Sequence, residues 1–189
     1  MKIINSNQHI EWRKSLSGKD ELNTAIEFDD LLKKQSFKGL QKINKRLNQK
    51  NIKKLKVTKK EIVNAGKLVT DDEKFALYEA IKNISYVSKS QLKDITNSIE
   101  PINGLTIWDK FIPIKSVGLY VPGGTAPLVS SFLMQVIPAI TAGCKDIIIC
   151  TPPDKNGKVY PAILWLAEQL NVSNIYKIGG AQALSLIHI

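Results

Sequence analysis

Apolar and polar residues follow a helical period through the first half of the chain. In residues 20–47 and 59–69, apolar positions recur every three or four residues among charged ones, which is typical of amphipathic helices. Thr58 and Glu61 form a capping-box pattern for the second of these helices. Acidic residues at 71–73 suit the start of a third helix. Its predicted core-facing stripe comprises Phe75, Leu77, Ala80, Ile81, Ile84 and Val87.

The second half contains short apolar runs that alternate with helical segments. We predict strands at residues 116–121, 146–150 and 174–178, and helices at 126–142 and 160–170. Apolar runs without alternation are typical of parallel strands buried on both faces. The order is β-α-β-α-β, in which right-handed crossovers give adjacent parallel strands with helices packed on the sheet. A sheet that stops after three strands is expected to leave an edge unpaired or a face uncovered.

These two patterns divide the chain. Residues 1–113 form a predicted N-terminal helical region and extended linker, in which Pro101 to Gly104 marks a turn. Residues 114–183 form a partial Rossmann-like unit, and residues 184–189 are an aberrant tail. The predicted fold class is therefore α/β. Trp108 and Phe111 lie in extended chain and are available for packing, Thr125 is a candidate cap of the helix after the first strand, and Gly143 is expected to end that helix.

Two glycine pairs follow the first and third predicted strands. They are Gly123-Gly124 and Gly179-Gly180, and the loop at 151–153 lies between them in sequence. Loops after parallel strands open at one edge of the sheet, where ligands bind. Glycine lets a backbone approach an anion closely, and the N–H groups of a following helix point at it. Neither pair fits a G-x-G-x-x-G or Walker A motif, and either alone would indicate a tight turn. Their matched placement favours a nucleotide site.

The charge and arginine content of the chain indicate whether nucleic acid is a partner. The net charge is +10, but most of the basic excess lies before the glycine-rich half, and Arg13 and Arg46 are the only arginines. Arginine is the usual residue for bidentate phosphate and base contacts, so we favour a solvated surface over a nucleic-acid site. One predicted helix face carries Lys34, Lys38, Lys42 and Lys45.

No apolar stretch approaches the ~20 residues of a membrane span, and the N-terminus lacks a signal-peptide pattern. We therefore predict no membrane partner and a cytoplasmic protein. Cys144 and Cys150 are the only cysteines, and we expect both thiols to be reduced and buried.

Three segments of the second half have a distinctive sequence. Residues 116–128 read Ser-Val-Gly-Leu-Tyr-Val-Pro-Gly-Gly-Thr-Ala-Pro-Leu, residues 151–153 read Thr-Pro-Pro, and residues 179–183 read Gly-Gly-Ala-Gln-Ala. In order and spacing, these segments resemble histidinol dehydrogenase, most closely over residues 112–183. The resemblance implies a zinc-dependent, NAD-linked homodimeric enzyme that oxidises L-histidinol through L-histidinaldehyde to L-histidine, the end of histidine biosynthesis.

The resemblance also implies which residues contact NAD. They are Tyr120 and Gln182, which both stand at the loop edge of the predicted sheet, where a phenol and a carboxamide can bond ribose or phosphate oxygens. The surrounding cofactor-binding loops comprise Pro122, Gly123, Gly124, Gly179 and Gly180.

The sequence departs from the family after residue 183. The family continues with a catalytic Glu-His pair and zinc ligands, whereas this chain ends at Ile189, and His9 and His188 are its only histidines. We therefore expect no catalytic or metal-binding residue here, and an N-terminal part of the enzyme that is inactive alone. The alternative is a non-catalytic nucleotide-binding or lysine-rich nucleic-acid-binding module.

Overall fold

The computed structural model describes residues 26–27, 30, 33–34, 38–43, 54–92, 98–108, 112–123, 127–180 and 182–183. The chain divides into two compact units, of which the larger is Ile52–Gly179. In the other unit, residues 38–43 are helical, and Leu40 and Ile43 are buried. Most of the helical pattern predicted for residues 20–47 lies outside the described residues.

Two helices precede the sheet. Helix α3 (Lys59–Ala65) begins with the predicted capping box, because Thr58 Oγ1 accepts the N–H of Glu61 and Glu61 Oε2 accepts the N–H of Thr58 at 2.8 Å. Helix α4 (Asp71–Ser90) begins at its N-cap, Thr70. The inner face of α4 carries Leu77, Ala80, Ile81 and Ile84, which pack against the core.

The predicted stripe of α4 is wrong at its two ends. Phe75 is 71% exposed and Val87 is also exposed. At 100° per residue, Phe75 is turned about 160° from the line through Leu77, Ile81 and Ile84, so it faces away from the core. Val87 is turned about 80° from this line, while Ser88 falls on it and is buried.

A hairpin joins the two halves of the chain. Strands β1 (Ser98–Ile102) and β2 (Leu105–Trp108) pair antiparallel, and the predicted turn between them has Gly104 at φ 85°. The strand β1 was not predicted. Trp108 is 65% exposed, so its ring is available for packing and is not buried in this structure. Phe111 lies outside the described residues.

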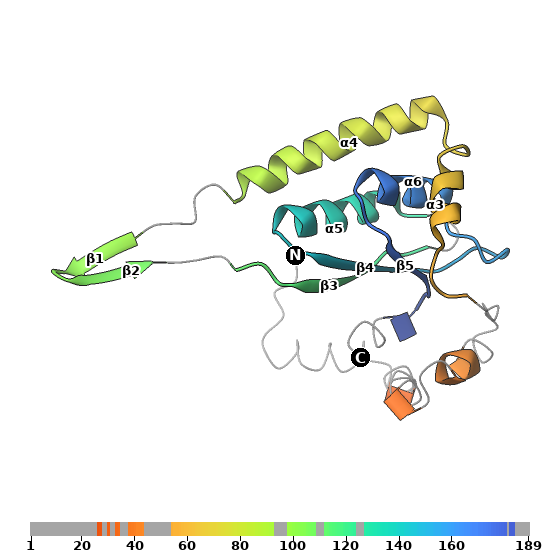
Figure 1. Cartoon of the computed structure of the whole chain (residues 1–189), viewed down its shortest axis with the longest axis horizontal. Coiled ribbons are helices and arrows are strands. Elements are labelled where there is room, and N and C mark those ends of the chain that lie inside the picture. The colour runs from red at the N-terminus through yellow and green to blue at the C-terminus, as the bar shows by residue number, and fades with distance from the viewer. Residues whose placement is uncertain are drawn as a thin grey trace, which may run out of the picture. The chain divides into compact units, whose positions relative to one another are not determined.

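The parallel sheet has the predicted topology. Strands β3 (Ser116–Tyr120), β4 (Asp146–Thr151) and β5 (Asn174–Lys177) lie side by side in sequence order, joined by helices α5 (Val129–Thr141) and α6 (Pro161–Gln169). Both crossovers step in the same direction, so right-handed connections place both helices on one face, as Figure 1 shows. The α/β fold with an incomplete Rossmann-like unit is confirmed.

The core lies between this face and its helices. Ile149 and Ile175 are paired in register on β4 and β5, and both are fully buried with Phe132 of α5 and Leu166 of α6. The cluster continues into α3 through Ile62. Helix α3 is therefore part of the same core as the sheet.

The outer edge of β5 is paired rather than open. Val57 N donates to Ile175 O and Lys177 N donates to Leu55 O, both at 2.8 Å, so residues 55–57 add a short antiparallel segment. Among the described strands, β3 has β4 as its only neighbour. Among the described strands, the expected unpaired edge is therefore that of β3, whereas the edge of β5 is paired.

The predicted cap of α5 is also wrong. The helix begins at Val129, and its N-cap residue is Leu128, which makes no side-chain capping bond. Thr125 stands four residues earlier, outside the described residues. At the other end, Gly143 follows the helix with φ 86°, as predicted. No helix among the described residues is long and apolar enough to cross a membrane.

Candidate functional site

Three loops meet at the carboxyl edge of the parallel sheet around Pro152. A Cβ on Gly123 would lie 2.7 Å from Pro152 Cγ, and a Cβ on Gly179 would lie 2.5 Å from Pro152 Cβ. Real Cβ atoms do not approach other atoms so closely, so the backbone can pass only as glycine. Gly123 and Gly179 have no positive φ, and close approach rather than backbone conformation explains them.

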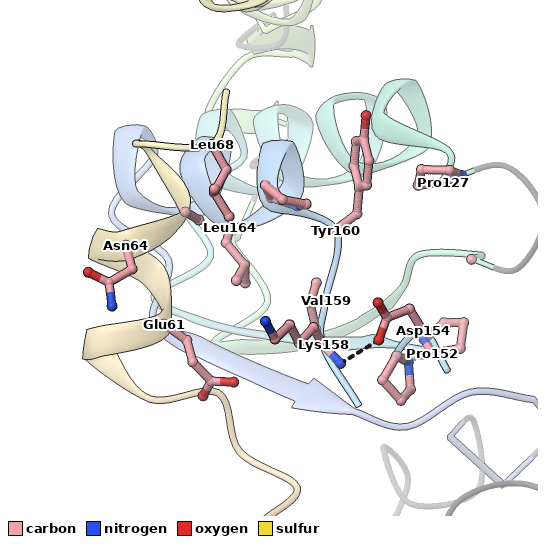
Figure 2. Close-up of a pocket in the computed structure, with 14 residues that line it drawn as sticks. Glu61, Asn64, Leu68, Pro127, Pro152, Asp154, Lys158, Val159, Tyr160 and Leu164 are labelled. Carbon is pink, nitrogen blue, oxygen red and sulfur yellow. Dashed lines mark hydrogen bonds between the residues drawn. The ribbon is translucent and has the colours of Figure 1, made fainter. Parts of the chain in front are cut away.

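A cavity of about 420 Å³ lies beside this junction. Its walls come from α3, from Gly123, from the loop after β4 and from the first turn of α6 (Figure 2). This volume falls within the roughly 300–1,000 Å³ of small-molecule sites. The cavity lies at the carboxyl ends of β3 and β4, where open α/β sheets bind ligands.

The lining of the cavity is mixed. Its apolar part comprises Ala65, Leu68, Pro127, Pro152, Pro153, Val159, Pro161 and Leu164. Its polar side chains are Glu61, Asn64, Asp154, Lys158 and Tyr160. Apolar walls with a few fixed polar groups suit a small organic molecule that carries a flat, apolar part and hydroxyl or charged groups.

An ion pair fixes the α3 wall of the cavity. Lys177, at the end of β5, donates to Glu61 Oε1. The Lys177 side chain is only 9% exposed and that of Glu61 is 34% exposed. Burial raises the pKa of Glu61, but hydrogen bonds from Lys177 and Thr58 outweigh it, and the net pKa is lowered. Glu61 is therefore a carboxylate that ties α3 to the sheet.

A tight turn fixes the Asp154 carboxylate in the opposite wall. Asp154 Oδ1 accepts the backbone N–H groups of Asn156 and Lys158, both at 2.8 Å. The Asp154 N–H donates to Lys158 O at 2.8 Å, and Gly157, at φ 76°, closes the turn. In Figure 2 the second carboxylate oxygen points away from the turn, toward Tyr160.

The predicted cofactor residues fall in both compact units. Tyr120 ends β3 and is half-buried, and its carbonyl accepts Gln135 Nε2 at 3.1 Å. Pro122 follows it, while Gly124 lies outside the described residues. Gly180 and Gln182 belong to the other unit. There Gln182 is 1% exposed, and a Cβ on Gly180 would lie 2.7 Å from Gln182 Oε1.

Several lining residues were not predicted as site residues. Asp154 had a signal, because it follows the second strand at the ligand-binding edge. Glu61 was predicted only as a helix cap, and Asn64 and Leu68 had no signal, since no sequence pattern shows that α3 packs over this edge.

No group of three histidine, cysteine, aspartate or glutamate residues that could hold a metal ion occurs in the described part of the chain. Cys144 is half-buried and Cys150 is buried, and both are free thiols. His9 and His188 lie outside the described residues.

Sequence and structure comparisons agree on one family. Residues 17–188 match the family model described as histidinol dehydrogenase. A histidinol dehydrogenase of Bacteroides thetaiotaomicron is 38% identical over 191 residues, which cover 98% of this chain and 44% of that protein. One of Bacteroides fragilis is 50% identical over 131 residues, which cover 69% of this chain and 30% of that protein. The chain belongs to the histidinol dehydrogenase family.

A solved structure extends this similarity to the fold. The crystal structure of histidinol dehydrogenase from Elizabethkingia anophelis matches with a TM-score of 0.82 at 39% identity, over 87% of this chain and 38% of that one. The chain thus spans less than half the length of these histidinol dehydrogenases. The resemblance drawn from residues 112–183 is confirmed, with the match beginning as early as residue 17.

Proposed function

We propose that this chain carries part of the NAD site of a histidinol dehydrogenase. The whole protein would oxidise L-histidinol through L-histidinaldehyde to L-histidine, at the end of histidine biosynthesis. The observation that carries the proposal is the junction of Gly123, Pro152 and Gly179 at the ligand-binding edge, in a chain of this family. Tyr120, Pro122, Gly123 and Gly124 would hold the cofactor from one loop. Gly179, Gly180 and Gln182 would hold it from the other.

The cavity supports a nucleotide in this place. Gly123 belongs to its wall, so the loop proposed to hold NAD opens into a space of about 420 Å³ whose lining combines apolar walls with a few polar side chains. When bound, NAD would supply the hydride acceptor for each of the two oxidations. The contribution of this chain is to bind and orient it, because the phenol of Tyr120 and the carboxamide of Gln182 can bond its ribose or phosphate oxygens.

Zinc dependence belongs to the proposal for the whole protein. The described residues hold no suitable ligand group, so we derive no step through the metal from them. We propose that the zinc ligands and the catalytic base are supplied by parts of the family's sequence that lie outside this chain. The isolated chain is then expected to bind NAD without oxidising histidinol.

Calorimetric titration of the 189-residue chain with NAD, beside an NADH-absorbance assay with L-histidinol, tests the proposal. We expect saturable binding that Tyr120→Phe weakens, and no turnover. Absence of NAD binding would contradict the proposed site. Turnover at an enzyme's rate would contradict the assignment of catalysis to other segments.

The exposed lysines Lys34, Lys38 and Lys42 are the observation behind the alternative, a nucleic-acid-binding module. Titration with duplex DNA across a salt series separates the two functions. Binding that falls steeply with salt, without NAD binding, would favour the module.

We also propose that the whole protein is a cytoplasmic homodimer, as the family resemblance implies. Exposed large apolar residues on the hairpin and the following segment, such as Ile102, Trp108 and Ile112, support a covered surface. Light scattering after size exclusion measures the oligomeric state.

A further inference from the structure

The geometry points to Asp154 as the residue that selects the 2′-hydroxyl of NAD over the 2′-phosphate of NADP, with the adjoining cavity taking the adenosine half of the cofactor. This inference rests on the proposed function, because it assumes that a dinucleotide binds at this edge. It adds a specificity determinant and a nucleoside site that the resemblance to the family does not name.

The place of Asp154 in the sheet is the first argument. Strand β3 leads into the glycine-containing loop, and β4 is its parallel neighbour in register. In dinucleotide-binding folds, an acidic residue after the strand next to the glycine loop hydrogen-bonds a ribose hydroxyl. Asp154 follows β4 and shares the cavity wall with Gly123, so one ligand can reach both.

The rigidity of the carboxylate is the second argument. Asp154 Oδ1 already accepts two backbone N–H groups, and the turn at 154–158 is closed by the N–H of Gly157 donating to Asp154 O at 3.0 Å. No described residue donates to Oδ2, which points away from the turn in Figure 2. A fixed acceptor of this kind bonds a hydroxyl without reorganisation, and it repels a phosphate placed at the same point.

The cavity beside Asp154 suits the adenine base. Leu68 lines this space from the turn after α3 and Leu164 lines it from α6, and in the view of Figure 2 the ring of Tyr160 lies above Asp154. Flat heterocycles bind between apolar and aromatic side chains, with a few polar groups to orient them. The α3 wall is held over the site by the ion pair between Glu61 and Lys177.

Lys158 sharpens the inference, because its cationic side chain lines the same cavity. An ammonium group attracts the phosphates of either cofactor, whereas a carboxylate fixed beside the ribose repels most strongly a phosphate attached to that ribose. We therefore expect Lys158 to contribute to affinity and Asp154 to contribute to the choice between NAD and NADP.

The test compares NAD, NADP and ADP by calorimetric titration of the full chain. Asp154→Asn keeps an oxygen that accepts the two turn N–H groups, so the turn is retained while the charge is lost. We expect this variant to narrow the ratio of NAD to NADP affinity by about tenfold or more. Asp146→Asn removes the same charge at the opposite end of β4 and is expected to leave the ratio unchanged.

Two further variants test the occupant of the cavity. Leu68→Asp changes a wall residue that is 70% exposed, so folding should tolerate it, and it is expected to weaken NAD, NADP and ADP alike. Lys158→Gln is expected to weaken all three, and NADP most because it carries one more phosphate, so this variant does not narrow the ratio of NAD to NADP affinity. Circular dichroism checks that each variant is folded.

The outcomes separate this inference from the proposed function. If Tyr120→Phe weakens NAD binding while Asp154→Asn leaves the ratio unchanged, or Leu68→Asp leaves ADP affinity unchanged, the function stands and the inference is overturned. If the unmodified chain binds none of the nucleotides, both are overturned.

Discussion

Gly179 approaches Pro152 so closely that a methyl group has no room: its Cβ would lie 2.5 Å from Pro152 Cβ and 3.2 Å from Pro152 Cα. Gly123 approaches the same proline, and its Cβ would meet Pro152 Cγ at 2.7 Å. The loops after β3, β4 and β5 therefore pack against one another at Pro152, and the packing requires that Gly123 and Gly179 have no side chain.

This junction predicts a specific pattern of rescue. Gly123→Ala and Gly179→Ala should each cost about 1–3 kcal/mol of unfolding free energy through overpacking. Adding Pro152→Ala should relieve the first variant, because Cγ is removed, but not the second, whose clash is with Cβ and Cα. Urea denaturation measures the four proteins and Pro152→Ala alone.

Gly157→Ala is the control for this pattern. Gly157 has φ 76°, and a Cβ added there would have no atom within 4 Å, so the cost of this variant comes from the backbone alone. Pro152→Ala should leave that cost unchanged. Equal rescue of Gly123→Ala and Gly179→Ala would contradict the proposed contacts.

The ion pair between Glu61 and Lys177 predicts an asymmetric pair of variants. Lys177 is the more buried partner, so Glu61→Gln leaves a cation in the interior and should cost about 2–3 kcal/mol, whereas Lys177→Met should cost about 1 kcal/mol. Chemical denaturation at neutral pH measures both. A larger cost for Lys177→Met would contradict this prediction, because it would mean that the unpaired Glu61 carboxylate destabilises the fold more than the unpaired Lys177 ammonium does.

The same carboxylate predicts a loss of stability in acid. The pKa of Glu61 is lowered on folding, so its contribution is present above the usual value of 4.5 and is lost as the pH falls through the folded-state pKa. The difference in unfolding free energy between wild type and Glu61→Gln should therefore shrink below that pH. A difference that stays constant from neutral to acid pH would refute the linkage.

Cys150 predicts a dependence at the alkaline end. Burial raises the pKa of its thiol from 9.0 to about 11, so the unfolded chain ionises first and stability falls as the pH rises between these values. Cys150→Ala should remove this part of the pH dependence. At neutral pH, a thiol reagent should modify the half-buried Cys144 before Cys150. Faster labelling of Cys150 would contradict its burial.

Tyr78 links α4 to α6 by one hydrogen bond and one ring contact. Its hydroxyl donates to Gln169 Oε1 at 2.7 Å, and its ring meets Trp165 edge-on at a centroid distance of 5.1 Å. Tyr78→Phe keeps the ring contact and should cost about 0.5–1.5 kcal/mol. Tyr86→Phe, at a side chain that is 76% exposed, is the matched control and should change nothing measurable.

Much of the fold could be predicted because it depends on local signals. The capping box at Thr58, the β-branched run of β4 and the glycine after α5 each specify an element through neighbouring residues. The helical spacing of apolar residues in α4 is also visible in the sequence, but which of these residues face the core depends on where the helix packs. Phe75 was therefore misplaced, although the helix itself was found.

The candidate site was predictable only along the strands. Gly123 and Gly179 stand at strand ends, where topology brings loops together, and so the sequence indicated this edge. The α3 wall is different. Glu61 and Lys177 are separated by 116 positions in the sequence, and no pattern in either segment predicts their contact. The sequence also offered anion binding as the reason for the glycines, whereas their contact with Pro152 already requires them.

The short antiparallel segment at residues 55–57 determines which edge of the sheet is open to a further strand. It occupies the outer side of β5, so any additional strand would have to join beside β3. A parallel strand added there would end next to Gly123 and would reverse the strand order at that point. Crevices formed at such reversals are where nucleotides settle in open α/β sheets. Because residues 55–57 occupy the edge at β5, a further strand would be added at β3, which is the strand that leads into the proposed cofactor loop.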